Sequence, residues 1–414
     1  MATSAAAVTT GASFSDDVLR EILVRLEDAA DLLRCAVTCK RWRGLVVKAS
    51  FLRRRRWPDH TSMFFSGFFV WEEAVLKKDP TYVTSFIPTS RSVFGSKPRS
   101  LMSFFPKAAR TARGMVHNAL PLAMRHGLLL VRLGSPNSSD VIVHLAVCNL
   151  LVGACHKLPP LQCNWKFDKS GYAILTSEDC FLNAKQQPFA PQGYSAFFKV
   201  LIIGNDTNQQ PQNLHKFTSG ETRWRGPSKF TFAAKEMIGC VTLRHSRAVV
   251  WHGTAHWLVR YPTSHSSSWH TIDVDAGTCC VSLTEIKTPV GHDKIHSYHE
   301  AQLTVAADGK LSLFHMQSRG NQLDVWTRHE DGGYSRWLCA PVIDLNPLGR
   351  KNLLMLGEKG GMLLVKDNHG NVYTVDLESG EMEEVAGFDR INRRQIVPFE
   401  MDWPTFFVSR LGSK

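Results

Sequence analysis

The stretch SFSDDVLREILVRLEDAADLLRCAVTCKRWRGLVVKASFLRRRRW, from Ser13 to Trp57, decides how this chain is organised. It predicts three short helices that carry more apolar surface than so few residues can bury among themselves. Ser15 is a good helix N-cap, and Asp16 and Asp17 place negative charge in the first turn, where exposed N–H groups and the helix dipole favour it.

Apolar residues recur at helical spacing in each of the three segments. They are Val18, Leu19, Ile22, Leu23 and Leu26 in the first, Leu32, Leu33, Ala36 and Val37 in the second, and Trp42, Leu45, Val46 and Ala49 in the third. A unit of this size buries only about 60% of its unfolded surface and is marginal alone. The surplus indicates a partner protein with a groove for a helix face. The alternative is a small helical subdomain that packs only against its own chain.

The pattern DDVLREILVRL…ADLLRCAVTCKRWRGLV…SFLRR closely resembles the F-box, the three-helix motif that docks on the Skp-family adaptor of cullin–RING (SCF) ubiquitin ligases. That family usually opens with Leu-Pro, where this chain has Phe14 and Ser15. Phe14 can still fill an apolar pocket, and Ser15 caps the helix. The resemblance implies that adaptor binding uses the following residues, some as contacts and some as the core behind them: Phe14, Val18, Leu19, Ile22, Leu23, Leu26, Leu32, Leu33, Val37, Trp42 and Leu45.

The charge and the N-terminal segment bear on partners and compartment. The net charge of +12 suits nucleic acid, an acidic partner or an anionic surface. No zinc-finger, RNA-recognition or homeodomain pattern accompanies it, so nucleic-acid binding is not expected. The run Arg53–Arg56 is either a nuclear-localisation patch or a solvated helix end. Residues 1–12 lack the basic start and apolar centre of a secretory signal and are expected to form a disordered tail.

These features place the protein in the cytoplasm, the nucleus or both, and no apolar run is long enough to suggest a membrane span. In such a reducing compartment the ten cysteines should be thiols, most of them buried as small hydrophobes.

The chain after the helices is rich in predicted strands. Residues 58–126 are interpreted as a linker with an irregular β segment, which either stands apart or joins the domain that follows. Over residues 127–414, units of about four short strands each close with a hairpin, around Gly153, Gly220, Gly277, Gly332 and Gly380. Such units are what β-propeller blades require. Five are clear, and a sixth comes either from Met63–Val93 or from the tail, Val397–Val408.

This region also resembles a known family, the kelch-like associated domain that follows the F-box in many plant proteins. The resemblance is carried by Gly127–Leu130, Val147–Asn149, Leu158–Pro160, Val250–Gly253 and His256–Leu258. The fold class expected for the whole chain is therefore α+β and multi-domain: an N-terminal three-helix F-box, residues 13–57, followed by a mainly-β, propeller-like domain. The alternative for the second part is an irregular β-sandwich or barrel.

The sequence contains only weak matches to catalytic and metal-binding motifs. His252 and His256 have the spacing of a helical zinc site, but they stand in a strand–turn–strand context without the usual Glu, and we expect core or rim histidines. The set Cys148, Cys155, His156 and Cys163 lacks a Cys-x-x-Cys knuckle, and Glu358–Gly361 lacks the end of a phosphate loop and reads as a turn before a strand. No catalytic residue, metal or cofactor is expected.

The sequence therefore predicts a non-catalytic, substrate-recruiting subunit of an SCF-type ubiquitin ligase. Its helices would bind a Skp-family adaptor, and through it cullin and RING subunits, while the propeller holds a substrate protein whose identity the sequence does not reveal. The alternative is a propeller interaction scaffold with a degenerate F-box. A third reading, a propeller enzyme, requires polar groups that converge in the central channel.

Overall fold

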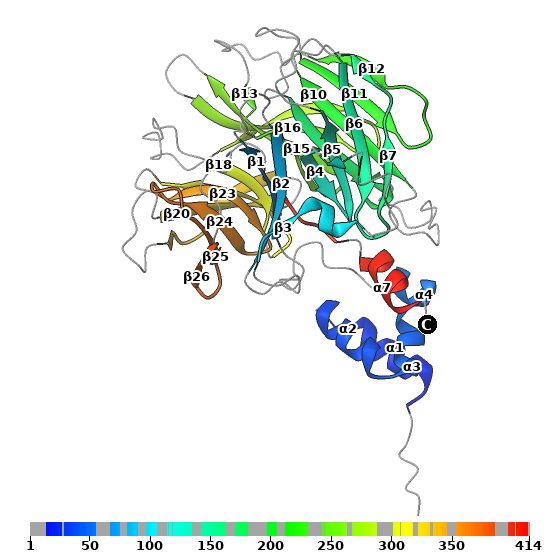
Figure 1. Ribbon diagram of the computed structural model, residues 1–414. Helices are drawn as coiled ribbons and strands as arrows, with labels where there is room; N and C mark the ends of the chain where they lie inside the picture. The colour runs from blue at the N-terminus through cyan, green and yellow to red at the C-terminus, as the bar shows by residue number, and fades with distance from the viewer. Residues whose placement is uncertain are drawn as a thin grey trace, which may run out of the picture. The chain divides into compact units, whose positions relative to one another are not determined.

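A computed structural model describes most of the chain (Figure 1). The described residues are 14–26, 29–54, 67–74, 81–89, 97–105, 114, 116–117, 119–134, 142–162, 170–180, 197–204, 212–230, 242–243, 245–262, 267–287, 301–306, 308–317, 322–331, 334–345, 353–385, 396–401 and 403–412. The tail expected at residues 1–12 lies outside them. The chain divides into a helical unit, Met1–Pro58 with Trp403–Lys414, and a β-unit, Asp59–Asp402.

The helical unit contains five described helices. They are α1 (Asp16–Val24), α2 (Ala29–Thr38), α3 (Lys40–Val46), α4 (Ala49–Arg54) and α7 (Trp403–Leu411). The Ser15 hydroxyl accepts a hydrogen bond from Val18 N at 3.3 Å, which confirms the predicted cap of α1. The single third helix predicted from the sequence is wrong, because α3 ends at Val46 and α4 begins separately at Ala49.

The described strands of the β-unit form six sheets, which we number as blades along the chain. The first contains β4 (Leu120–Arg125), β5 (Leu128–Leu133), β6 (Ile142–Asn149), β7 (Ala154–Lys157) and β8 (Leu161–Gln162); the second, β9 (Gly171–Thr176), β10 (Phe198–Gly204), β11 (Gln212–Thr218) and β12 (Arg225–Phe230); the third, β13 (Thr242–Leu243), β14 (Val249–Trp251), β15 (Thr254–Pro262), β16 (Ser267–Asp275) and β17 (Val281–Ile286).

The fourth contains β18 (Ala301–Val305), β19 (Leu311–Met316), β20 (Gln322–Asp331), β21 (Tyr334–Cys339) and β22 (Ile343–Asp344); the fifth, β23 (Leu354–Lys359), β24 (Met362–Lys366), β25 (Val372–Asp376) and β26 (Met382–Val385); the sixth, β27 (Val397–Pro398), β1 (Gly67–Ala74), β2 (Thr81–Pro88) and β3 (Arg99–Ser100). Two short helices complete the description, η2 (Leu101–Phe104) and α6 (Ser177–Cys180).

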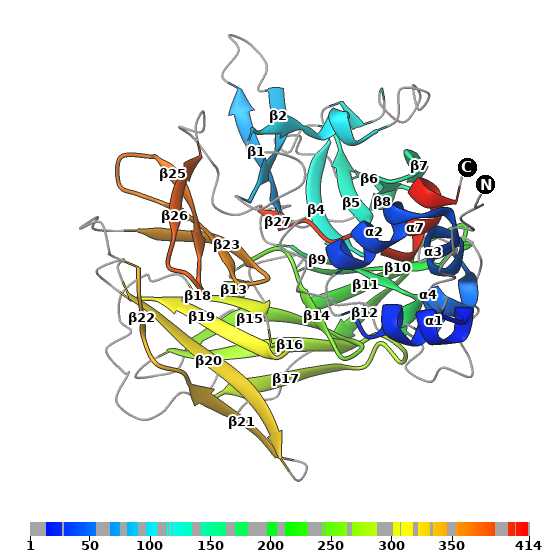
Figure 2. The same ribbon diagram turned by 90° about the horizontal axis from the view of Figure 1, so that it is seen from below.

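The six sheets close into a propeller. Contacts between inner strands run from β4 to β9, β14, β18, β23 and β27, and from β27 back to β4, and these strands surround the middle of the ring in Figure 2. The inner strands β4 and β9 are buried at every residue, whereas β12, at the outer edge of its sheet, is exposed at nearly every one. Because the inner strands are buried and the outer ones are exposed, the sequences of the inner strands are nearly continuous apolar runs.

The sixth blade combines both segments that the sequence offered as alternatives. The order of its strands is β27-β1-β2-β3, so the C-terminal strand is innermost and the strands after the helices lie outside it. Phe399, directly after β27, packs its ring against Phe69 of β1 and Phe86 of β2, with centroids 6.1 and 5.5 Å apart. The segment called a linker thus supplies propeller strands.

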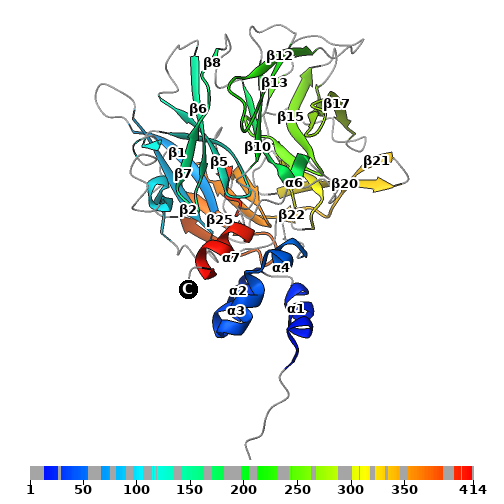
Figure 3. The ribbon, with the colours of Figure 1, turned by 90° about the vertical axis from the view of Figure 1, so that its right-hand side faces the viewer.

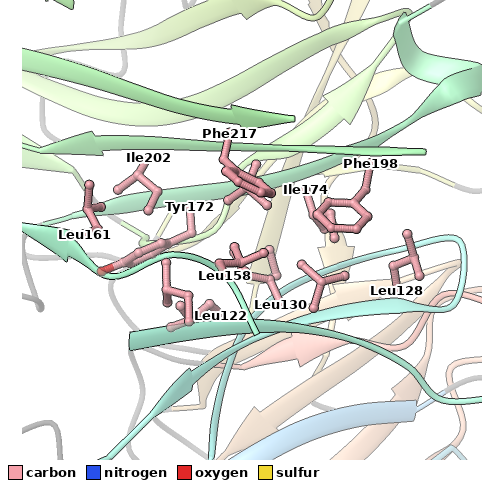
Figure 4. Close-up of a cluster of buried hydrophobic side chains, with 14 of the residues drawn as sticks. Leu122, Leu128, Leu130, Leu158, Leu161, Tyr172, Ile174, Phe198, Ile202 and Phe217 are labelled. Atoms are coloured by element: carbon pink, nitrogen blue, oxygen red, sulfur yellow. The ribbon is translucent and has the colours of Figure 1, made fainter. Parts of the chain in front are cut away.

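Each seam between neighbouring blades has a cluster of buried apolar side chains. The cluster between the first and second blades is drawn in Figure 4, where Leu122 and Leu130 face Tyr172 and Ile174. Similar clusters follow at the next four seams. At the seam between the sixth and first blades, the cluster of described residues contains only Trp71 and Leu120. Among the described residues, this closing seam therefore has the smallest apolar cluster.

Most of the predicted hairpins form where the sequence placed them. Gly153, Gly220 and Gly380 adopt φ of 72°, 89° and 73°, a region that glycine enters without steric cost. In the third blade the positive φ falls on Cys279, at 60°, rather than on Gly277. Gly332 lies outside the described residues.

The cysteine prediction is wrong in two respects. Cys148 and Cys155 are joined in a disulfide, because the pairing of β6 with β7 sets them directly opposite each other, with Cα atoms 4.1 Å apart. The described free cysteines are half-buried or exposed rather than buried, and Cys39, Cys280 and Cys339 are exposed. Cys163 and Cys240 lie outside the described residues.

The end of the chain also differs from the prediction. The sequence analysis assigned all of residues 127–414 to the β-domain, but Trp403–Lys414 belongs to the helical unit. Of the tail Val397–Val408, β27 joins the sixth blade and ends at Pro398, and α7 begins at Trp403.

Candidate functional site

The residues predicted to bind an adaptor separate into a core and a surface. Leu19, Leu23, Leu32 and Leu45 are buried, and Leu26, Leu33 and Trp42 are half-buried. Phe14, Val18, Ile22 and Val37 are exposed, at 63%, 44%, 47% and 54%. We call these last four the docking face. Large apolar side chains this exposed on so small a unit indicate an interaction surface.

The docking face follows from the spacing of α1. Val18 and Ile22 are four residues apart and lie along one side of the helix, and Phe14 stands just before its N-cap, while Leu19 and Leu23 are buried in the unit. Helix α2 adds Val37 on its own exposed side and buries Leu32.

An arginine side chain contacts the residues at the start of α1. Arg41 of α3 donates from Nη2 to the Phe14 carbonyl oxygen at 2.5 Å and pairs with the Asp16 carboxylate at 2.8 Å. These contacts fix the backbone just before α1, where Ser15 also caps the helix. Phe14 is therefore presented from an ordered position although this chain lacks the usual Leu-Pro.

A second candidate site lies among the inner strands of the propeller. We call it the central charge network, and it contains Arg125, Asp179, Arg247, Glu358, Lys359 and Glu400. The Arg125 guanidinium contacts Asp179 at 2.7 Å and Glu400 at 3.5 Å, and Lys359 contacts Glu400 at 2.9 Å. The network joins the first, second, third, fifth and sixth blades.

Each carboxylate in the network has defined partners. Asp179 also accepts hydrogen bonds from the backbone N and the hydroxyl of Thr176, at 2.8 and 3.1 Å. Glu358 is hydrogen-bonded to the Thr304 hydroxyl and accepts from Gly361 N at 2.9 Å. Burial raises the pKa of the Glu358 carboxyl despite these bonds and the nearby charges of Lys359 and Arg247.

The network links several blades through pairs of opposite charge. Burial lowers the pKa of the Arg247 guanidinium to about 10, which leaves it charged at neutral pH, and Glu400 and Glu358 oppose that shift. The carboxylates of the network thus lie next to arginine and lysine side chains. Among the residues that the structure describes, no group of three or more His, Cys, Asp or Glu side chains is arranged to hold a metal ion.

The two histidines with zinc-like spacing do not meet. His256 is buried, and its Nδ1 lies 2.7 Å from Asp273 Oδ1 on the neighbouring strand. His252 sits in the turn before β15 with φ of 47°, and its ring stacks on Trp251 at 4.1 Å. They are a core and a rim histidine, as predicted. Glu358–Gly361 is likewise the end of β23 and a turn.

Residues 16–57 match the family model described as F-box-like. The match covers the four N-terminal helices and most of the docking face. It does not reach Phe14 or α7. No curated protein sequence matches the chain.

Solved structures similar to the chain have distant sequences. An α-L-arabinofuranosidase from Fusarium graminearum with an iminosugar inhibitor is 10% identical with a TM-score of 0.38, over 64% of this chain and 79% of its own. The β-propeller domain of the Trilobed protease from Pyrococcus furiosus is 13% identical with a TM-score of 0.34, over 78% and 79%. AofleA from Arthrobotrys oligospora, a triple mutant, is 9% identical with a TM-score of 0.38, over 83% and 91%. TM-scores in this range support no conclusion about activity.

The described helices are all too short to cross a bilayer, and no candidate membrane span is found among them.

Proposed function

We propose that this protein is the substrate-recognition subunit of an SCF-type ubiquitin ligase. The observation that carries the proposal is the docking face within an F-box-like match: apolar side chains at four-residue spacing on α1 stay exposed while the leucines between them form the core. A groove on a Skp-family adaptor would bury this face, and cullin and RING subunits would join through the adaptor.

The β-unit would hold the substrate protein. Its six blades give a rigid ring whose connecting loops can vary without cost to the fold. Holding a substrate lysine near the charged ubiquitin-conjugating enzyme turns a bimolecular encounter into a local one, so the chain itself would perform no bond chemistry. We further propose that the ring is of the kelch-like, F-box-associated type found in plants, and that the protein acts in the cytoplasm or nucleus without binding nucleic acid.

The direct test is adaptor binding by the full chain. Ile22→Asp places a carboxylate in the docking face, where a partner would have to bury it unpaired. We expect the dissociation constant to rise at least ~30-fold, equivalent to about 2 kcal/mol. The matched control is Leu338→Asp on β21, since Leu338 is 51% exposed and Ile22 is 47% exposed.

The second candidate is an interaction scaffold that no longer engages a ligase, and the Phe14-Ser15 opening is the observation that favours it. If the wild-type protein forms no complex with Skp-family adaptors at micromolar concentration, the scaffold is the better reading. If Ile22→Asp and Leu338→Asp bind equally well, the docking face is misplaced.

A further inference from the structure

The C-terminal helix α7 has a buried side and an exposed side. Trp403, Phe407 and Leu411 are 5%, 0% and 9% exposed, and they stand four residues apart on one face. Val408, next to Phe407, is 40% exposed. The Phe406 and Phe407 rings meet edge to face at 5.9 Å. Such a face needs an apolar surface to cover it.

Among the described elements, helix α2 is the one that α7 contacts most extensively, and both belong to the helical unit (Figure 3). Leu32 and Ala36 of α2 are fully buried, although a set of short helices of this size buries little by itself. The same helix carries Val37 of the docking face and the half-buried Leu33.

We propose that the adaptor-docking unit is a composite of both ends of the chain, in which α7 positions α2 for docking. This inference rests on the proposed function. Residues 403–412 lie outside the F-box-like match, so the motif alone is not the complete docking unit. Phe407, buried against the unit, is the positioning residue, and it does not itself belong to the docking face.

The experiment compares variants of the full chain with the Skp-family adaptor as the probe. Phe407→Ala removes a fully buried ring, and Val408→Ala changes the exposed neighbour in the same turn. We expect Phe407→Ala to raise the dissociation constant at least ~10-fold and to speed amide hydrogen exchange in α2, with exchange in β9 and β10 unchanged. Val408→Ala should stay within about twofold, and Phe407→Leu should restore most of the affinity.

Unchanged affinity and unchanged α2 exchange in Phe407→Ala would overturn the inference, and so would equal effects of Phe407→Ala and Val408→Ala. If Phe407→Ala does not yield folded protein, Leu411→Ala decides the matter, with an expected loss of about threefold or more in affinity, while Phe407→Leu should stay close to wild type. If the wild-type chain does not bind the adaptor, the proposed function fails. The amide hydrogen exchange of α2 in Phe407→Ala then still decides whether α7 supports α2.

Discussion

Glu400→Gln tests how the propeller is closed. Glu400 follows β27, and its side chain is 14% exposed. It accepts a hydrogen bond from Lys359 of the fifth blade at 2.9 Å and lies 3.5 Å from Arg125 of the first. Its carbonyl oxygen accepts from Gly127 N at 2.9 Å. The substitution keeps the shape and removes the charge at the seam that has the smallest apolar cluster among the described residues.

The magnitude follows from the pKa of Glu400. Burial by itself would raise this pKa, but the positive charges of Lys359, Arg125 and His126 outweigh burial and lower it from 4.5 to about 2. Each pKa unit corresponds to about 1.4 kcal/mol, so the ionised carboxylate contributes about 3 kcal/mol to the folded state. Because the folded pKa is depressed, this stability is fully present above pH 4.5 and is lost as the pH falls towards 2.

The assay is urea unfolding followed by tryptophan fluorescence, which reports on the buried Trp257 and Trp326 of the ring. At pH 7 we expect Glu400→Gln to lower the free energy of unfolding by about 3 kcal/mol, and we expect the difference from wild type to shrink below pH 4.5. The control is Glu384→Gln on the exposed strand β26, which should change stability by less than about 0.5 kcal/mol. Equal effects of the two variants at pH 7, or a difference that does not depend on pH, would refute the reasoning.

Three further substitutions follow from local geometry. Gly44→Ala should stabilise α3 by up to about 1 kcal/mol, because an added Cβ meets nothing within 4 Å and alanine favours a helix; slower amide exchange in α3 would show it. Gly171→Ala should cost about 1–3 kcal/mol in urea unfolding, because its Cβ would lie 2.5 Å from Trp257 Nε1 in a packed seam. Leu23→Asp should abolish adaptor binding by unfolding the helical unit, since Leu23 is 1% exposed; circular dichroism would show lost helix, whereas Ile22→Asp should keep its helix.

The local elements could be predicted because their signals are short-range. Ser15 caps α1 through a residue three positions on, and the hairpin glycines act within their own turns. The alternation of apolar and polar residues, and the runs of apolar residues, likewise indicated five of the six blades. The same pattern could not separate core from docking face, since Val18 and Leu19 are both apolar and only packing exposes one and buries the other.

Contacts between residues that are far apart in the sequence left no comparable signal in it. A two-residue strand such as β27 is too short to show a period, so its pairing with β1 could not be anticipated. The ion pair of Arg125 with Glu400 joins groups 275 residues apart. Two cysteines seven residues apart read as unrelated thiols until the register of β6 and β7 places them opposite each other.

The two ends of the chain meet in both units by different physical means. In the ring, Glu400 after β27 lies between Lys359 and Arg125, so charges that are largely buried and weakly screened by salt contribute to closure. In the helical unit, α7 contacts α2 and buries Phe407, so its proposed support of the docking helices depends on apolar area. Only residues 399–402 separate β27 from α7. A short C-terminal segment therefore stabilises the unit proposed to hold substrate and the unit proposed to bind the adaptor, and acid should weaken its contribution to the first, which rests on charge, more than its contribution to the second, which rests on apolar area.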